Sequence, residues 1–293
     1  MATTVQQPAH IRAETGAATH RHSILAILRK AVRDTRKSTM WLAIGLGLYA
    51  LFIMGFYSSI ADQAEEFDEL IQGYPEGFIS MFYSGPIEEF SMADPGNYLQ
   101  IEYVTWTLLI IGAILIGQAF NAITNAERDD SMDMLLSLPV SRRDYLIGRV
   151  LSMCVMVLIV LTAAVLALLV SSVFWPAFDV GIGDLMAAIY AMFFPLMVIA
   201  GFSTLLAAAV PSSRHFAGAV AYLFMIGSYL LHGFSGSVDQ LKDIRPLMLF
   251  DYYNAADIIR DGIDVSNILV LGAVALVYFG LAWWFIDKKE LGV

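Results

Sequence analysis

The chain has 293 residues, of which 58% are hydrophobic and only 15% are charged. Soluble globular proteins carry about 25% charged residues, so this chain has too little polar surface for a water-soluble enzyme. Its 22 Gly, 9 Pro and single Cys also exclude collagen-like, disordered and disulfide-rich classes.

Long runs without a charged residue predict an all-α integral membrane protein. A helix needs about 20 apolar residues to cross the ~30 Å hydrocarbon core. The alternating short segments of a β-barrel are absent. Six spans are expected within a transmembrane domain over residues 40–286, with a kink at Pro195 in the fourth. The spans are about 40–60, 103–124, 150–174, 185–210, 216–234 and 268–286.

Two segments precede the first span. Residues 1–22 show no periodicity and are expected to be a disordered cytoplasmic tail. Residues 23–39 place Ile24, Ile27 and Ala31 on one helical face and most of the basic side chains elsewhere. This pattern predicts an amphipathic helix at the membrane interface. The alternative is an ordinary charged flank of the first span with no helix of its own.

The distribution of basic residues predicts the orientation. Cytoplasmic loops of membrane proteins are enriched in Lys and Arg. Placing the N-terminus inside puts fourteen of the 17 Lys and Arg on the cytoplasmic side, and 18 of the 27 Asp and Glu on the other. Both termini are therefore expected to be cytoplasmic, with residues 287–293 as a short tail.

Two outer segments are long for plain connections. Residues 61–100 contain Gly-Pro and Asp-Pro-Gly turn signals, and residues 235–267 contain Pro246 and an Asp-Gly pair. Internal structure is expected in both, because long loops without structure of their own are uncommon in compact proteins. The alternative is a solvated lid.

The inner loop over residues 125–145 carries a short helical pattern with an apolar stripe at Met132, Leu135 and Leu136. Pro139 is expected to end this helix, and Ser141 is a plausible N-cap for the next. Exposed Met and Leu side chains on a cytoplasmic helix must be buried against either a second protein or the bilayer. We favour a protein partner.

The inner-loop residues resemble a known family signature. Glu127, the run from Asp133 to Arg143, and Gly148-Arg149 are similar to the Glu…Leu-Leu-Leu-Ser-x-Pro-Val-Ser-Arg…Gly-Lys pattern of ABC-2-type permeases, the membrane subunits of ABC transporters. Three further stretches resemble that family. They are 94–98 before the second span, the outer segment with Pro246, Tyr252, Tyr253 and Gly262, and the tail 287–292.

The resemblance implies a function and its sites. The chain would be the permease of an exporter in the plasma membrane, and its inner loop would be a short cytoplasmic coupling helix that docks on a separate ABC ATPase. ATP and Mg²⁺ would be bound there, with no cofactor on this chain. A second permease chain, identical or homologous, would complete the assembly. An outer gate would include Pro246, Tyr252 and Tyr253. The coupling residues would be Glu127, Asp129, Met132, Asp133, Leu135, Leu136, Leu138, Pro139, Ser141, Arg142 and Arg143.

Other chemistry is sparse in the sequence. A phosphate-binding loop needs Gly-Lys followed by Ser or Thr, and no lysine here follows a glycine. No metal-binding or catalytic motif is found. The predicted spans contain no charged residue, which disfavours the alternatives of an ion-coupled secondary transporter and a polytopic membrane enzyme. Nucleic-acid binding is not indicated.

A few polar residues lie inside the predicted spans. They are candidates for the path of a hydrophobic or amphipathic substrate, with interhelical hydrogen bonding as the alternative. These residues are Gln118, Asn121, Thr162, Ser203 and Thr204.

Overall fold

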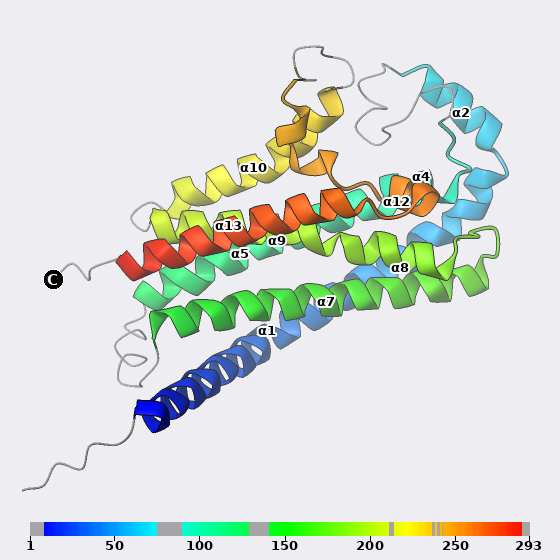
Figure 1. The fold of residues 1–293 in the computed structure, drawn as a ribbon. Coiled ribbons are helices and arrows are strands. Elements are labelled where there is room, and N and C mark those ends of the chain that lie inside the picture. Colours follow the sequence, from blue (N-terminus) through cyan, green and yellow to red (C-terminus); the bar gives the residue numbers. More distant parts are fainter. Residues whose placement is uncertain are drawn as a thin grey trace, which may run out of the picture.

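The computed structural model describes residues 9–74, 90–128, 141–210, 214–235, 238, 241 and 243–288. Within these ranges every regular element is a helix, and the long helices run side by side in one bundle (Figure 1). The long helices are α1 (Ala9–Ala61), α5 (Thr105–Arg128), α7 (Arg142–Phe174), α8 (Ile182–Ala191), α9 (Phe193–Ala209), α10 (Arg214–Phe234) and α13 (Val265–Lys288).

Six of the described segments are long and apolar enough to cross a membrane. This confirms the predicted all-α membrane fold with six spans. They are Ser23–Ala61, Pro95–Ile123, Arg143–Phe174, Ile182–Ala209, His215–Phe234 and Val265–Ile286. Helix α5 ends and α7 begins at the end of the bundle where α13 also finishes, which we call the α5–α7 end (Figure 1). The opposite end, which carries the short helices, is the α12 end.

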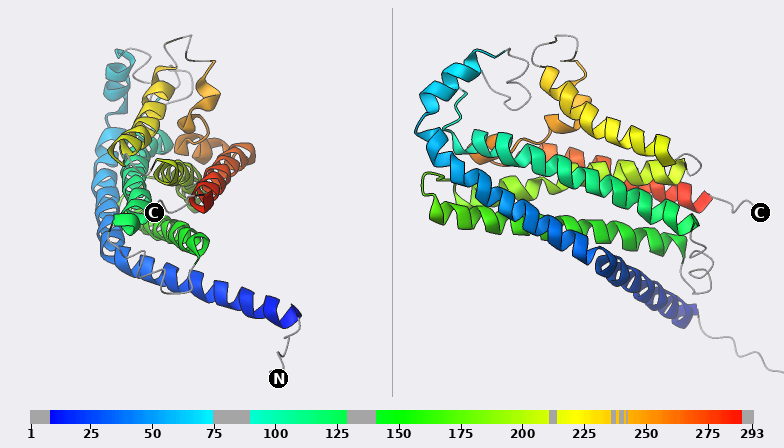
Figure 2. Two further views of the ribbon diagram at one scale, coloured as in Figure 1. Left: turned by 90° about the vertical axis from the view of Figure 1, so that its left-hand side faces the viewer. Right: turned by 180° about the vertical axis from the view of Figure 1, so that it is seen from behind.

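Helix α9 forms the centre of the bundle, with α5, α10 and α13 packed around it, while α1 lies along α7 (Figure 2). Leu196, Ile199 and Ala200 of α9 are fully buried. Gly201 allows close packing, because a Cβ there would lie only 3.2 Å from the Ala275 carbonyl oxygen of α13. The core is therefore built from apolar side chains and small residues that let helices approach closely.

The N-terminal region differs from the sequence prediction. Helix α1 begins at Ala9 and continues without a break to Ala61, so the expected disordered tail over 1–22 is wrong from Ala9 onward. Four alanines between residues 9 and 18 explain the difference, because Ala has the highest helix propensity. The interfacial helix over 23–39 and the first span are parts of one long helix. Residues 1–8 lie outside the described residues.

The fourth predicted span is divided. Helix α8 ends at Ala191 and α9 begins at Phe193, two residues before Pro195. Proline has no N–H, and its ring clashes with the carbonyl four residues earlier, which here belongs to Ala191. The interruption between α8 and α9 therefore lies just N-terminal to Pro195, where the sequence predicts a kink.

Both outer segments have internal structure, as expected. The first contains α2 (Ala64–Gln72), α4 (Pro95–Leu99) and the π-helical turn η2 (Gln100–Val104), which leads directly into α5; residues 75–89 of this segment lie outside the description. The second contains two 3₁₀ turns, η3 (Arg245–Leu247) and η4 (Leu249–Asp251), followed by α12 (Ala255–Asp261). Helix α12 packs against α4 and α8.

Candidate functional site

The predicted coupling loop falls largely in residues 129–140, which lie outside the described residues. That range contains Asp129, Met132, Asp133, Leu135, Leu136, Leu138 and Pro139. Glu127 lies in the last turn of α5, and Arg142 is the first residue of α7, but their side chains also lie outside the description. Among the predicted coupling residues, Ser141 and Arg143 have side chains within the described part of the chain.

The start of α7 is fixed by a cap and a cation–π contact. The Ser141 hydroxyl oxygen accepts a hydrogen bond from the Asp144 backbone N–H at 3.1 Å, so the predicted N-cap is confirmed. The Arg143 guanidinium lies 5.2 Å from the centre of the Trp283 ring on α13. The first turn of α7 is thereby joined to the last turns of α13.

A tyrosine joins the two helices from which the coupling loop emerges. The Tyr145 hydroxyl donates a hydrogen bond to the Ala122 carbonyl oxygen of α5 at 2.9 Å. The Arg149 guanidinium covers the Tyr145 ring at 5.7 Å. Sequence reasoning missed this contact, because an aromatic residue in the first turn of a helix has no pattern that names its partner. The structure therefore ties the end of α5 to the start of α7, on either side of the predicted coupling loop.

The candidate substrate-path residues make separate contacts. The Gln118 amide nitrogen contacts the Met156 sulfur at 2.9 Å, and the Thr162 hydroxyl lies 3.0 Å from the Tyr190 hydroxyl. These two contacts cross between helices, as the alternative interpretation expected. Ser203 and Thr204 instead donate to carbonyls of their own helix. Asn121 is exposed on α5.

None of these five residues lines the cavity beside α12, the cavity between α8 and the start of α13, or the groove between α1 and α7. The structure thus does not bring them together as one site.

The three predicted outer-gate residues are brought close together at the α12 end. The Tyr252 hydroxyl donates to the Pro246 carbonyl oxygen at 2.5 Å, which closes the turn that contains η3 and η4. Tyr253 is only 4% exposed, and its hydroxyl donates to the Ala188 carbonyl oxygen of α8 at 3.0 Å. Burial raises the pKa of the Tyr253 hydroxyl. These residues fix the outer segment to the bundle.

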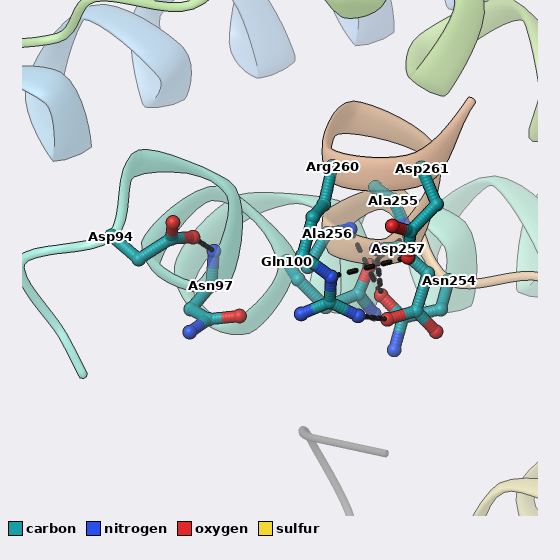
Figure 3. A network of polar contacts seen from close by, with 9 residues as sticks. All are labelled: Asp94, Asn97, Gln100, Asn254, Ala255, Ala256, Asp257, Arg260 and Asp261. Atoms are coloured by element: carbon teal, nitrogen blue, oxygen red, sulfur yellow. Dashed lines mark hydrogen bonds and ion pairs between the residues drawn. The ribbon is translucent and has the colours of Figure 1, made fainter. Parts of the chain in front are cut away.

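A polar network joins the outer segments at α4 and α12 (Figure 3). Asp94 caps α4 by accepting from the Asn97 backbone N–H at 2.8 Å. Asn254 caps α12 by accepting from the backbone N–H groups of Ala256 and Asp257 at 2.9 and 3.3 Å. Both caps satisfy helix-end donors that otherwise lack partners.

Gln100 connects these two helices. Its side-chain oxygen accepts from the Ala255 backbone N–H at 2.8 Å, and its amide nitrogen donates to the Thr105 hydroxyl at 3.2 Å. Thr105 in turn donates to the Gln100 carbonyl at 2.8 Å, within the π-helical turn. One buried amide therefore links the start of α12 to the turn that opens α5.

Four tyrosines fasten α1 to the segment that precedes α5. Sequence reasoning missed this set, because the partners are backbone carbonyls 36 to 57 residues away. The hydroxyl of Tyr49 donates to Glu102, that of Tyr57 to Ala93, that of Tyr98 to Ile53 and that of Tyr103 to Leu46. Because two of the donors lie on α1 and two on α4 and η2, the linkage is reciprocal.

A cavity of about 380 Å³ lies beside α12 and is lined by both carboxylates and guanidinium groups. Arg260 donates to Asp257 at 2.7 Å and to Asp261 at 3.1 Å. Burial raises the pKa of the Asp257 carboxyl, and the neighbouring Arg260 opposes that effect. Hydrogen bonds from Ser266 lower the pKa of the exposed Asp264 carboxyl. Within the described ranges no group of His, Cys, Asp and Glu is suited to hold a metal ion.

These features define a class of protein, a polytopic α-helical membrane protein whose outer segments are folded onto the bundle and whose second and third spans flank a loop. The family model described as ABC-2 family transporter protein matches residues 25–291. The chain belongs to that family and is the permease, or membrane subunit, of an ABC transporter. No curated protein matches it.

Proposed function

We propose that this permease is the membrane half of an exporter in the plasma membrane, driven by ATP hydrolysis on a separate nucleotide-binding subunit. ATP and Mg²⁺ would bind to that subunit, since no lysine of this chain follows a glycine as a phosphate-binding loop requires. This chain would supply the path and the docking loop. The ABC-2 family match supports the assignment of the ATPase as the energy source.

The observation that carries the proposal is the linkage at the α5–α7 end. The loop over residues 129–140 leaves α5 and returns at α7, and Tyr145 joins these helices through the Ala122 carbonyl. A force applied to the loop would therefore act on both helices together. Arg143 extends the connection to Trp283 of α13. This arrangement suits a loop that transmits motion from a docked ATPase into three spans.

A second permease chain is required to complete the path. The windows that identify α1 and α13 as spans are only 22% and 17% buried within this chain. Large apolar side chains, including Phe52 and Leu276, remain exposed on them. Lipid or a second permease can cover such faces. Alternating access needs two membrane halves around one path, so we expect a homodimer or a homologous heterodimer with two ATPases.

The proposed substrate is hydrophobic or amphipathic. The polar residues considered for a substrate path are scattered, and two of them bond to their own helix. A path lined mainly by apolar side chains does not favour a strongly polar solute. The ion-coupled carrier receives less support, because such carriers use ionisable residues at the membrane midplane.

The test is reconstitution in two stages. The purified permease alone, in detergent and in vesicles, is expected to show no ATPase activity above background. Affinity purification from the native host should bring down an ATPase subunit with a phosphate-binding loop, and the complex should hydrolyse ATP. Robust hydrolysis by the isolated permease, or a purified complex that contains no such subunit, would contradict the proposal.

A further inference from the structure

A groove of about 320 Å³ runs between α1 and α7, in the half of the bundle nearer the α5–α7 end. Its volume is at the lower end of the range for small-molecule sites, roughly 300–1,000 Å³. Apolar side chains form most of its walls, including Val32 and Ala43 of α1 and Val155 and Met156 of α7. None of the predicted site residues lines the groove, although Gln118 contacts the sulfur of the groove residue Met156.

The groove opens sideways, on the side of α1 and α7 where apolar side chains are exposed. Met40 and Ile44 at its α1 edge are 49% and 43% exposed, and Ile159 at its α7 edge is 45% exposed. Both helices are long and apolar enough to cross a membrane. An apolar crevice between two spans, open to the side, is accessible to the hydrocarbon chains of the bilayer.

One charged residue, Arg36, is among the groove-lining side chains. Arg29 lies seven residues earlier, which is two turns along α1 on nearly the same face. Both side chains are exposed, and neither makes an ion pair within the part of the chain that the structure describes. Asp34 is the single carboxylate between residues 23 and 61, and it points about 200° away from Arg36 around the helix.

We propose that this groove binds an anionic phospholipid, with one acyl chain between α1 and α7 and the phosphate beside Arg29 and Arg36. The apolar walls match the acyl chain, and the guanidinium groups, which make no ion pair with any described residue, match the negative phosphate. Arginine stems lie along apolar surface while their heads reach the polar interface, which suits a site at this depth. The occupant is the lipid itself, since the groove opens to the hydrocarbon region.

The chain offers a matched control for charge. Lys30 and Lys37 each follow one of the two arginines, are also exposed, and point about 100° further around the helix. The double substitution Arg29→Gln with Arg36→Gln and the double substitution Lys30→Gln with Lys37→Gln therefore remove the same charge from the same two turns. Only the first pair lies on the groove face.

The experiment measures lipid binding to the full-length chain in mild detergent by native mass spectrometry. The probes are phosphatidylglycerol and phosphatidylcholine with identical acyl chains. For the wild type we expect about tenfold tighter binding of phosphatidylglycerol, and the arginine pair should reduce this to the phosphatidylcholine level. The lysine pair should change it less than about twofold. Ala43→Leu, which fills the groove without changing charge, should weaken binding of both lipids.

Several results would overturn the site. They are equal binding of the two lipids by the wild type, equal losses in the two double variants, or unchanged binding in Ala43→Leu. Displacement by excess glycerol phosphate would show that a soluble phosphate, rather than a lipid, is the ligand. Failure of the wild type to retain any lipid would mean that a protein surface covers the groove. If the Arg29→Gln, Arg36→Gln double variant does not fold, the lipid preference of the wild type and the binding by Ala43→Leu still test the proposed site.

Discussion

The two ends of the bundle are held together in different ways. At the α12 end, Gln100, Tyr253 and the four tyrosines between α1 and η2 reach across to backbone groups of other elements. At the α5–α7 end, Tyr145 donates one hydrogen bond from α7 to a carbonyl of α5, and Arg143 lies over the Trp283 ring of α13. Among the described residues, polar side chains that reach distant backbone groups are thus concentrated at the α12 end.

This contrast indicates which end is built to stay fixed. Hydrogen bonds from buried side chains to distant carbonyls specify a single arrangement, because breaking one leaves a polar group unpaired away from water. An end held by few such contacts can change its arrangement at lower cost. We therefore expect the α12 end to keep one arrangement during transport. We expect the α5–α7 end to move when a docked ATPase acts on it.

The largest expected effect concerns which end faces the cytoplasm. In a Cys154→Ala background, cysteines placed at Ser91 and Ser237 should react with a membrane-impermeant reagent added to intact cells, and one at Ser137 should not. The reason is the excess of Lys and Arg on the predicted inner side. Labelling of the Ser137 cysteine from outside would show that the α5–α7 end, and not the α12 end, faces the outside of the cell.

The next largest effect tests the coupling loop. Leu135→Asp places a carboxylate at the predicted contact with the ATPase. Losing a buried hot-spot side chain commonly costs about 2 kcal/mol of binding, which is roughly thirtyfold in affinity, and an unpaired carboxylate should do worse. Co-purification with the ATPase should fail while the permease remains monodisperse. Leu109→Ala, within α5, serves as the control and should leave association intact. Near-normal ATPase association and turnover in Leu135→Asp would remove the basis for protein docking at this loop.

A third variant breaks the fastening of the α12 end. Gln100→Leu leaves the Ala255 N–H buried without its acceptor, which should lower the free energy of unfolding by about 1–3 kcal/mol. Denaturant unfolding in detergent measures the change. Gln118→Leu is the matched control, because its amide contacts only a thioether sulfur, a weak acceptor, and should change stability less. If the two substitutions lowered the free energy of unfolding equally, the hydrogen bond from Ala255 to Gln100 would not be a major contribution to stability.

The smallest expected effect is at the opposite end. Tyr145→Phe removes the hydrogen bond to the Ala122 carbonyl but keeps the ring under Arg149, so stability should fall by only about 0.5–1.5 kcal/mol. Stimulation of the ATPase by the permease should fall while binding of the two subunits persists. Tyr222→Phe, whose exposed hydroxyl lies 3.3 Å from the Ala113 carbonyl, should leave both unchanged. If the Tyr145→Phe permease stimulated the ATPase as well as the wild type does, this hydrogen bond would have no part in coupling ATP hydrolysis to the permease.

Periodicity and composition predicted the spans well. Runs of uncharged residues have few ways to fold in lipid other than as helices, so the six spans and the break near Pro195 follow from the sequence. The Ser141 cap was predictable for a similar reason, because the signal and its partner lie within one turn. The helical start at Ala9 was not expected, since alanine-rich stretches without an apolar face carry little periodicity.

The contacts that organise the two ends could not be predicted. Tyr98 reaches the Ile53 carbonyl and Gln100 reaches Ala255, across 45 and 155 residues. A backbone carbonyl or N–H is present in nearly every residue, so no pattern in the sequence marks a particular one as a partner. The coupling-loop residues from Asp129 to Pro139 remain predictions, because they lie outside the described residues.

The π-helical turn η2 sets the rotational phase between two parts of one span. Its Thr105 N–H bonds to the Gln100 carbonyl, five residues back, so the turn holds one residue more than a regular α-helix would. Deleting a single residue from 100–104 would restore α-helical spacing and turn α4 by about 100° relative to α5. Tyr98 would then leave the Ile53 carbonyl of α1, and Gly96 would leave Ala256 of α12. The number of residues in this turn, as well as their identity, therefore determines which neighbours the helix meets.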